Sequence, residues 1–490
     1  MTKNEGSVFS DYHISSNLLD EVITENGQVN KYYSSIYKHF SSLNPADMNL
    51  LNEYAKLSFL NQGITYAVYS DSNKGTERIF PFDLFPRIIT LKQWETIEKG
   101  VKQRNLALNE FIKDVYTDQK ILKDKIVPAE LIFSSSSYCE DMRGIKPAGG
   151  IYCHICGTDI IQHNDGEFYV LEDNLRCPSG VSYVLSNRVA MKRTLSHLFR
   201  NSRVRTVQEY PPELISMLQS VAPKEKAKPT CVVLTPGIYN SAYYEHAFLA
   251  QAMGIELVEG RDLFVENNYV YMRTIYGPRK IDVIYRRIDD AFLDPMVFNS
   301  ESLLGIPGVM SAYRSGNVTL VNAPGTGISD DKAIYAYVPD IIRYYLNEEP
   351  IIKNVPTYLC EREEDRKYVL EHIPELVIKP VDQSGGYGIK IGNRLTKEEI
   401  EEMKVKIVDN PREYVAQPIM SLTVHATYIE DEDGFEPRHI DLRTYTLLGK
   451  DSCFVLQGGL SRVALKKGSL IVNSSQGGGS KDTWVIEDPE

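Results

Sequence analysis

The chain has 490 residues, of which 42% are apolar and 24% charged, and its formal net charge is −12. This length predicts two or three domains or one large α/β assembly. Acidity without a basic stripe argues against a nucleic-acid partner. The sequence has no signal-like start and no apolar run near the roughly 20 residues of a membrane span. Seven scattered cysteines suit a reducing compartment, so we expect a cytoplasmic protein without a membrane partner.

The first part of the chain is expected to be mainly helical. Apolar residues at helical spacing predict a helix over 91–116. The preceding "FPFDLFPRII" is extended and punctuated by proline, so it could line a cleft. We therefore place an N-terminal helical region that contributes to a cleft at 1–150.

The next predicted elements are strands from about 150, a helix at 181–200 and a linker at 222–229. After the linker, "TCVVLTPG", "SAYYEHAFLAQAMG" and "IELVEG" alternate strand, helix and strand, and "KIDVIYRRID" adds a later strand. This alternation predicts a Rossmann-like layer. Residues 330–346 are predicted to be helical, with Asp330 capping the first turn, and a mixed α/β pattern follows.

A predicted hairpin ends in acidic side chains. In "TDIIQHNDGEFYVLEDN", Asp165-Gly166 predicts a two-residue type I′ turn. That turn places Asp159 opposite Glu172, on the strand face that also carries Asn174, and a three-residue loop would break this pairing. Opposed carboxylates destabilise a sheet, and a divalent cation with oxygen ligands removes the repulsion. The alternative is an exposed hairpin with solvated carboxylates.

Cys153 and Cys156 in "CHIC" have the spacing of zinc ligands. A structural zinc site needs four ligands, and the sequence has no second pair, although His154 and Cys177 could be recruited. Cysteines on a buried strand are the simpler interpretation.

A second group of signals lies far downstream. "LVIKPVDQSGGYGIKI" joins a buried strand, which carries Lys379 near its end, to a glycine-rich turn and another strand. Gly385, Gly386 and Gly388 permit close backbone approach, so successive N–H groups can cradle phosphate oxygens, and Lys379 can add a charge. The segment is not a Walker A loop, and a flexible hairpin with a solvated lysine is the alternative.

Later extended segments carry further polar side chains. Gln417 lies in "EYVAQPI", an edge segment that could offer polar groups to an adenine ring. Arg443 and Arg462 lie on predicted strands, where an arginine is either an ion-pair partner or a phosphate clamp. "NSSQGGGSKDTW" is a glycine-rich loop, expected to be mobile, that carries Lys481.

In combination, these segments resemble the ATP-grasp superfamily. The acidic hairpin comes last in ordinary members but here precedes "VIKPVDQSGGYGIKI", an order that indicates circular permutation. The segments "QRNLALNEFIKDVY", "VLEDNLRCPSGVSYVLSNR", "RRIDDAFLDP" and "GTGISDDKAIYAYVP" are similar to the circularly permuted ATP-grasp family related to glutathionylspermidine synthetases. This resemblance covers about 100–390. It implies an α/β (α+β) fold with a metal-binding part at 151–221, a Rossmann-like pre-ATP-grasp domain at 229–345 and a nucleotide-binding part at 346–490.

The resemblance also implies a site. Asp159, Glu172 and Asn174 would hold two Mg²⁺ ions, or Mn²⁺, against the phosphates of ATP. The residues assigned to the nucleotide are Lys332, Lys379, Gly385, Gly386, Gly388 and Gln417, with Lys481 of the second glycine-rich loop added.

One position departs from the family pattern. Glutathionylspermidine synthetases place an arginine two residues before the metal-binding aspartate, where this chain has Gly157. The positive charge for the transferring phosphate must then come from elsewhere, and the candidates are Arg176, Arg188, Arg443 and Arg462.

The implied activity is that of a carboxylate–amine ligase. A small-molecule or peptide carboxylate would attack the γ-phosphoryl group of ATP, and an amine would then displace phosphate from the acylphosphate. Two alternatives stay open: a kinase-like phosphotransferase on the same fold, and a nucleotide-binding partner protein without catalysis. Glutathione and spermidine are not carried over, because Gly157 departs from the pattern.

Overall fold

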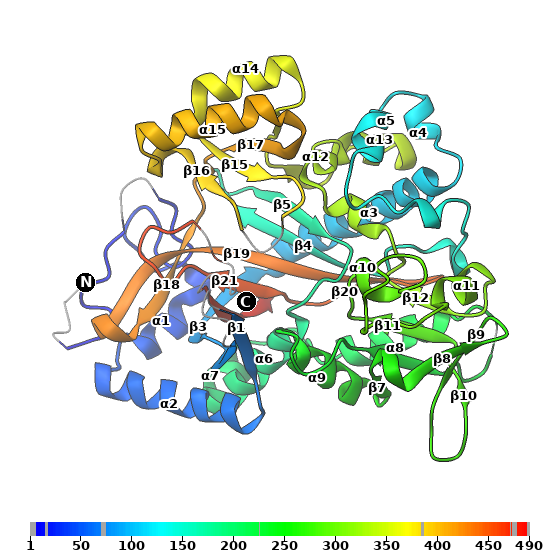
Figure 1. Ribbon diagram of the computed structural model, residues 1–490. Helices are drawn as coiled ribbons and strands as arrows, with labels where there is room; N and C mark the ends of the chain where they lie inside the picture. The colour runs from blue at the N-terminus through cyan, green and yellow to red at the C-terminus, as the bar shows by residue number, and fades with distance from the viewer. Residues whose placement is uncertain are drawn as a thin grey trace.

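The computed structural model describes residues 6–14, 18–69, 75–224, 226–383, 387–470, 472 and 478–487, with the backbone alone for 65–69 and 75–78. Three parts are visible in Figure 1: a large central sheet, a parallel sheet drawn in green at the lower right, and a small sheet under two helices at the top.

A nine-stranded sheet forms the centre of the molecule. Its strands are β3 (Phe82–Thr90), β4 (Ile155–Gln162), β5 (Phe168–Asn174), β13 (Lys353–Asn354), β18 (Val424–Ile429), β19 (Gly434–Leu448), β20 (Cys453–Val455), β21 (Leu460–Val463) and β22 (Gly479–Ile486). The main order is β13-β5-β4-β19-β21-β22-β3, and β18 and β20 pair with β19. The β4–β5 hairpin therefore lies beside strands from the end of the chain.

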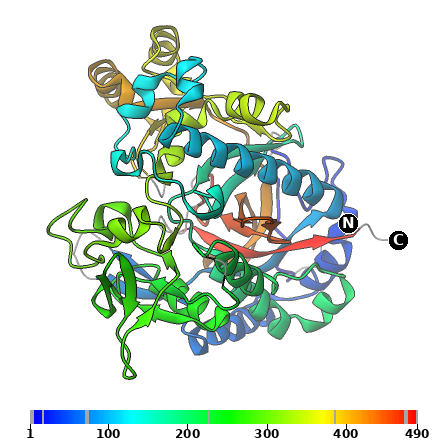
Figure 2. The ribbon, with the colours of Figure 1, turned by 90° about the vertical axis from the view of Figure 1, so that its right-hand side faces the viewer.

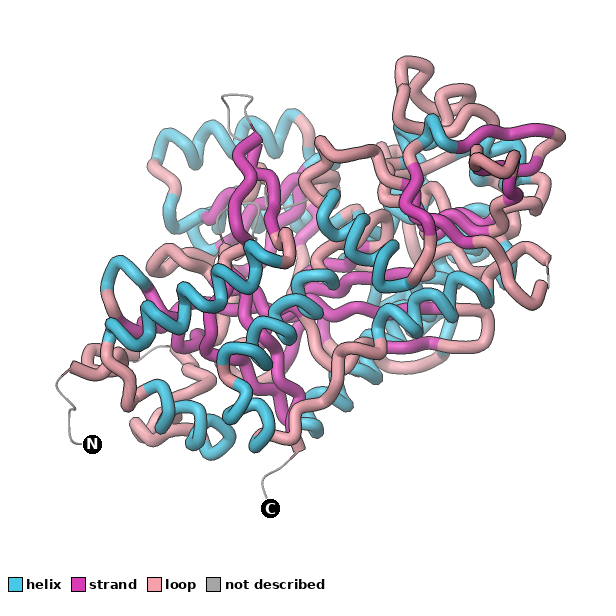
Figure 3. Tube along the Cα trace, turned by 90° about the horizontal axis from the view of Figure 1, so that it is seen from below, coloured by secondary structure: helices cyan, strands magenta, loops and turns pink. Residues whose placement is uncertain are grey.

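Helices from the first half of the chain pack around this sheet, and in Figure 3 several of them cross the strands on the side that faces the viewer. They are α1 (Ser34–Phe40), α2 (Pro45–Asn61), α3 (Leu91–Tyr116), α4 (Lys120–Lys123), α5 (Ala129–Phe133), α6 (Val181–Thr194), α7 (Ser196–Asn201) and α8 (Tyr210–Ser220). Helix α3 begins at a capping box of Thr90 and Gln93 and buries Trp94 and Ile97. The predicted helix over 91–116 is confirmed.

The N-terminal region is less helical than predicted. A hairpin of β1 (Thr65–Tyr69) and β2 (Gly75–Ile79) interrupts it, and the extended segment before α3 is strand β3. β3 pairs in parallel with β22 from the opposite end of the chain. Strand β3, from the N-terminal region, therefore completes one edge of the central sheet.

The predicted Rossmann-like layer is confirmed. Its parallel strands β6 (Cys231–Leu234), β7 (Glu256–Val258), β11 (Val283–Arg286) and β12 (Thr319–Val321) have the order β12-β11-β6-β7. Helix α9 (Tyr243–Met253) ends at Gly254, which takes a φ of +68°. The remaining elements here are β8 (Leu263–Glu266), β9 (Tyr269–Met272), β10 (Arg279–Lys280), α9 (Tyr243–Met253), α10 (Asp290–Leu293) and α11 (Val309–Arg314).

A small sheet of order β14-β17-β15-β16 lies at the upper left in Figure 2. Its elements are β14 (Tyr358–Leu359), β15 (Leu376–Pro380), β16 (Lys390–Ile391), β17 (Tyr414–Pro418), α14 (Glu363–His372) and α15 (Lys397–Asp409). Leu376 and Ile378 pack in an apolar cluster with residues of both helices. Because strand side chains alternate, Val377 and Lys379 face the other way, toward the central sheet.

Two local predictions are wrong. The predicted helical segment consists of α12 (Lys332–Tyr335) and α13 (Val338–Leu346), and Asp331, not Asp330, caps α12 by accepting from the N–H of Ala333. Strand β17 is not an edge segment, because β14 and β15 pair with it on both sides. Among the helices in the described part of the chain, none has the length and apolarity that crossing a bilayer requires.

Candidate active site

The β4–β5 hairpin pairs Asp159 with Glu172, as predicted, although its turn differs from the prediction. The loop has three residues, 164–166, and Gly166 takes a φ of +84°. This loop shifts the register by one residue. A bulge at Leu171 shifts it back before Glu172 is reached, so the two carboxylates still oppose each other.

Two arginines from neighbouring strands hold the buried carboxylate of Asp159. Arg443 on β19 donates from Nε and Nη2 at 2.5 and 2.7 Å, and Arg462 on β21 donates from Nη2 at 2.8 Å. Burial by itself would raise the pKa of Asp159, but the two guanidinium groups hold it well below its usual value. Arg462 also donates from Nε to Asp441 at 2.9 Å. Asp441, which the sequence analysis missed, is therefore part of this charged cluster.

Gly157 lies against Pro178 and the stem of Arg443. A Cβ built at Gly157 would lie 3.1 Å from the Cβ of Pro178 and 3.5 Å from the Cδ of Arg443. The stem of Arg443 therefore passes at ordinary van der Waals distance from the place where a side chain of residue 157 would begin, and the tighter contact is with Pro178. The guanidinium on the adjacent strand that binds Asp159 is that of Arg443.

Glu172 and Asn174 present oxygen atoms on the same strand face as Asp159. Burial and the neighbouring Asp159 raise the pKa of Glu172, as expected for opposed carboxylates without a cation between them. Asn174 donates from Nδ2 to the carbonyl of Gly157 at 3.3 Å, which leaves its Oδ1 for another partner.

These oxygen donors fit Mg²⁺. No group of three or more His, Cys, Asp or Glu residues in the described ranges is arranged to hold a metal. The protein would therefore supply two carboxylates and an amide at most. Magnesium sites of this kind are completed by water and substrate phosphates.

Lys332 and Lys379 approach the hairpin from other parts of the chain. Lys379 on β15 donates to the Oε1 of Gln417 at 2.6 Å, and Lys332, the first residue of α12, donates to the carbonyl of Gln383. Burial lowers the pKa of Lys379 to about 8, although Glu172 opposes this effect. The two lysines and the acidic hairpin are thus close enough to influence one another.

One cavity contains both halves of the predicted site. Its polar residues include Asp159, Glu172, Lys332, Lys379 and Gln417. Its apolar walls are formed by Ile161, Leu171, Val377, Ile389, Ile391, Pro418, Met420, Leu422, Leu470 and Val472. A mostly apolar cavity with a few convergent polar groups is typical of a cofactor or nucleotide site.

The glycine-rich turn is described only in part. Gly385 and Gly386 lie outside the described residues. Gly388 takes a φ of +72°, and a Cβ there would lie 2.8 Å from the ring of Pro380, so this position requires glycine.

Two of the predicted site residues lie elsewhere. Lys481 is on strand β22, fully buried, and its Nζ donates to Asp83 and to two carbonyls, so the predicted nucleotide contact from a mobile loop is corrected. Arg188 on α6 donates to both carboxylate oxygens of Asp482 at 3.0 and 2.8 Å and to the carbonyl of Thr483. It stabilises the core and is not a phosphate clamp.

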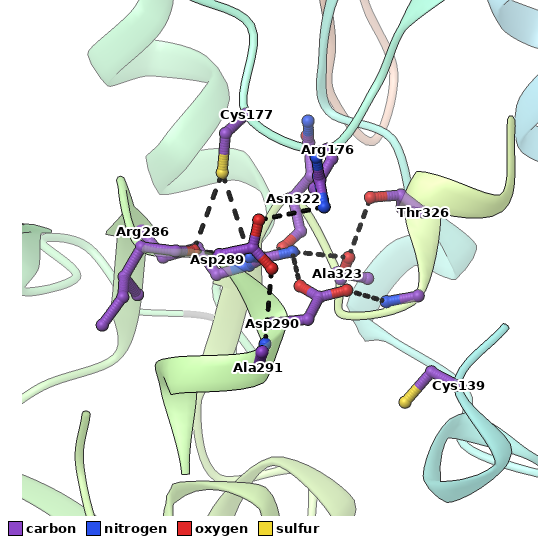
Figure 4. A network of polar contacts seen from close by, with 12 residues as sticks. Cys139, Arg176, Cys177, Arg286, Asp289, Asp290, Ala291, Asn322, Ala323 and Thr326 are labelled. Carbon is purple, nitrogen blue, oxygen red and sulfur yellow. Dashed lines mark hydrogen bonds and ion pairs between the residues drawn. The ribbon is translucent and has the colours of Figure 1, made fainter. Parts of the chain in front are cut away.

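Arg176 lies beside the acidic hairpin in a separate network, which Figure 4 shows together with Cys177 and Arg286. Its Nη1 is 2.9 Å from an oxygen of Asp289, in the segment after β11. Arg176 therefore does not share the carboxylate of Asp159 with Arg443 and Arg462.

Asp173 points to the opposite strand face from Glu172, and it is buried. Arg104 on α3 donates from Nε to both of its oxygens at 2.8 and 2.7 Å. Asparagine is not expected to be tolerated at this position, because breaking a buried ion pair is strongly destabilising.

We expect Asp173→Asn to lower the free energy of unfolding by about 3 kcal/mol, because Arg104 keeps its charge without a partner. Urea titration measures this change. The folded variant is expected to retain the Mg²⁺-dependent nucleotide turnover of the parent, since Asp173 faces away from the cavity. Unchanged stability would show that this pair does not stabilise the fold.

The cysteines of "CHIC" are buried, as the simpler interpretation holds. The thiols of Cys153 and Cys156 donate to the Oδ1 of Asn105 at 3.4 and 2.7 Å.

A paired-carboxylate hairpin that faces a lysine-bearing sheet across one cavity, next to a Rossmann-like layer, has the arrangement of an ATP-grasp protein. The family model described as circularly permuted ATP-grasp type 2 matches residues 86–464, and the chain belongs to this family.

Several known proteins are similar to this chain. An uncharacterised protein of Synechocystis sp. is 51% identical over 471 residues, which cover 96% of this chain and 97% of that protein. A Frankia casuarinae protein with the provisional name glutamate–cysteine ligase 2-2 is 38% identical over 95% of this chain but only 53% of its own length. The apo structure of a glutathione synthetase-like effector from Globodera pallida superimposes with a TM-score of 0.61 at 12% identity, covering 91% of this chain and 98% of that one. This last likeness shows the fold alone.

Proposed function

We propose that the protein is an ATP-dependent carboxylate–amine ligase that forms an amide bond through an acylphosphate and releases ADP and phosphate. One observation carries this proposal: Lys332 and Lys379 share a cavity with the Asp159–Glu172 pair and with Arg462, which donates to Asp159. Phosphoryl transfer requires fixed positive charge around the transferring group and little covalent chemistry from the protein. The ligase name of the Frankia relative agrees with this assignment.

Each group has a role in this proposal. Lys332 and Lys379 bind phosphate oxygens, and Gln417 with the apolar walls binds the base. Glu172, Asn174 and the remaining lone pair of Asp159 would hold Mg²⁺, which neutralises charge on the phosphates when bound. The substrate carboxylate attacks the γ-phosphorus, the bond to the β-phosphate oxygen breaks, and ADP leaves.

Hydroxylamine trapping tests this function. The full chain is incubated with Mg²⁺, ATP, hydroxylamine and pooled amino acids and small peptides, and the products are analysed by mass spectrometry. A ligase yields an acyl hydroxamate together with ADP. A kinase-like enzyme yields a stable phosphorylated product without hydroxamate, and a non-catalytic protein binds Mg·ATP without forming ADP; either result would contradict the proposal.

Nucleotide affinity is expected to depend on the charge of Lys379. Because its pKa is lowered to about 8, this lysine is cationic below that pH and neutral above it. We expect the affinity for Mg·ATP to fall about tenfold as pH rises from about 7 to about 9.5, since a charge-assisted hydrogen bond to phosphate is lost. Calorimetric titration at several pH values measures this change.

The control for this prediction is Lys379→Arg, which stays cationic throughout the range. Its affinity is expected to change little with pH. A parallel fall in both proteins would assign the pH dependence to another group.

A further inference from the structure

Beside the nucleotide cavity, the loops that follow β11 and β12 meet at the carboxyl edge of the parallel sheet, and Figure 4 shows the polar contacts there. In open α/β sheets, ligands bind outside this edge. Here the edge carries an ion pair between Arg176 and Asp289, whose side chains are 33% and 41% exposed.

The edge is joined directly to the metal end of the cavity. Asp330 accepts from the backbone N–H of Leu175 at 2.6 Å and from that of Arg176 at 3.4 Å. Asn322 donates from Nδ2 to the carbonyl of Leu175 at 2.6 Å. Arg176 follows Glu172 by four residues and lies in the bend after β5, so the chain between them spans at most about 13 Å. A ligand held at Arg176 would therefore lie within reach of the phosphate end of the cavity.

The neighbouring Arg286 has a structural role in this network, and its burial and hydrogen bonds can be compared with those of Arg176. It is fully buried, and it donates to the carbonyls of Asn322, Ile288 and Ala323 at 2.7, 2.8 and 3.1 Å. It also forms an ion pair of 2.6 Å with Asp290, so its donors are committed to these carbonyls and to that carboxylate.

Arg176 differs from Arg286 in exposure and in partners. Within the described residues, its guanidinium has a single ion-pair partner, Asp289, on the solvent side. Such a surface pair contributes only about 0–1 kcal/mol to the free energy of unfolding. A ligand that offers both side chains better hydrogen-bond geometry can therefore separate the pair at small cost. Gly327 provides the space for the stem, because a Cβ there would lie 3.2 Å from the Cδ of Arg176.

We propose that Arg176 and Asp289 bind the amine substrate, and that this substrate is a free α-amino acid. The exposed pair presents one positive and one negative group, which complement the carboxylate and the ammonium of a zwitterion. Arg176 can bind the carboxylate through two parallel hydrogen bonds, and Asp289 can accept from the ammonium. This inference rests on the proposed ligase function and adds to it the class of the nucleophile.

The resulting step is balanced. The amino nitrogen forms a bond to the acyl carbon, and the bond from that carbon to the phosphate oxygen breaks. Of the two protons that the ammonium loses, one goes to the leaving phosphate and one to solvent.

Saturation-transfer NMR tests the site without requiring turnover. The full chain, with Mg²⁺ and a non-hydrolysable ATP analogue, is mixed with a pool of the common L-amino acids or with a pool of their carboxamides. We expect amino acids from the first pool to bind and their carboxamides to bind about 10- to 100-fold more weakly, because one charge-assisted contact is lost. Absence of binding from the first pool, or equal binding from both, would overturn the proposal.

Variants identify the residues. Arg176→Met is expected to weaken amino-acid binding about 10- to 100-fold without changing nucleotide affinity. Arg343→Met is the control for loss of an exposed arginine, since Arg343 is also exposed and forms ion pairs at 3.0 Å with Asp340 and Glu349. Equal losses in both variants would overturn the assignment. Failure of the ligase proposal would appear separately, as the absence of hydroxamate from a protein that still binds amino acids.

Discussion

Replacing Glu172 by glutamine is expected to reduce Mg²⁺-dependent ADP formation by about 10²–10³-fold. The substitution removes the negative charge that would hold the cation at the phosphates. The fold should remain intact, because Glu172 has only a long ion pair of 3.7 Å with Arg443, and its pKa is raised by burial and by repulsion from Asp159. Removing that repulsion leaves the free energy of unfolding unchanged or slightly higher. ADP release and urea titration measure the two quantities.

Glu167→Gln on the same hairpin is the matched control, since Glu167 lies exposed near the turn. It is expected to keep the parental rate. If Glu172→Gln also turned over ATP normally, Glu172 would not be a metal ligand.

The second large effect is expected at Arg443. Arg443→Met should lower the rate of ADP formation by about 10²–10³-fold, because the cation that holds Asp159 and, in the proposed mechanism, offsets the charge of the transferring phosphate is lost. The variant should still fold, since Asp159 keeps its bond of 2.8 Å from Arg462. Initial rates and unfolding curves for the purified variant provide the measurement.

Arg462→Met separates catalysis from stability. Arg462 binds both Asp159 and Asp441, and its loss leaves Asp441 buried without its guanidinium partner. We expect the free energy of unfolding to fall by about 3–5 kcal/mol in this variant. Equal stability of the two variants, or a normal rate in Arg443→Met, would contradict the division of roles.

Much of the fold follows from local sequence patterns. Helical periodicity over 91–116, the strand–helix alternation of the Rossmann-like layer and the strand that carries Lys379 are each encoded by adjacent residues. The opposition of Asp159 and Glu172 was also predicted, although the loop and the bulge that produce it were not. A one-residue bulge at Leu171 has no distinct sequence signal, because its side chain is apolar like those of ordinary strand positions.

Which of the four candidate arginines bind the acidic hairpin could not be predicted in the same way. Arg176, Arg188, Arg443 and Arg462 are all plausible from sequence, and only tertiary partners distinguish them. Arg443 and Asp159 are 284 residues apart, and they meet because β19 pairs with β4. Lys481 was misplaced because the glycines before it suggest a loop, whereas its own residues form a buried strand.

The most direct test of the central claim is a crystal structure of the full chain with Mn²⁺ and a non-hydrolysable ATP analogue. The anomalous signal of manganese locates the metal independently of any assumption about the ligand. The structure predicts a peak about 2.2 Å from oxygens of Glu172 and Asn174, with the triphosphate between that metal and Lys332 and Lys379. A metal peak elsewhere, or nucleotide bound outside this cavity, would contradict it.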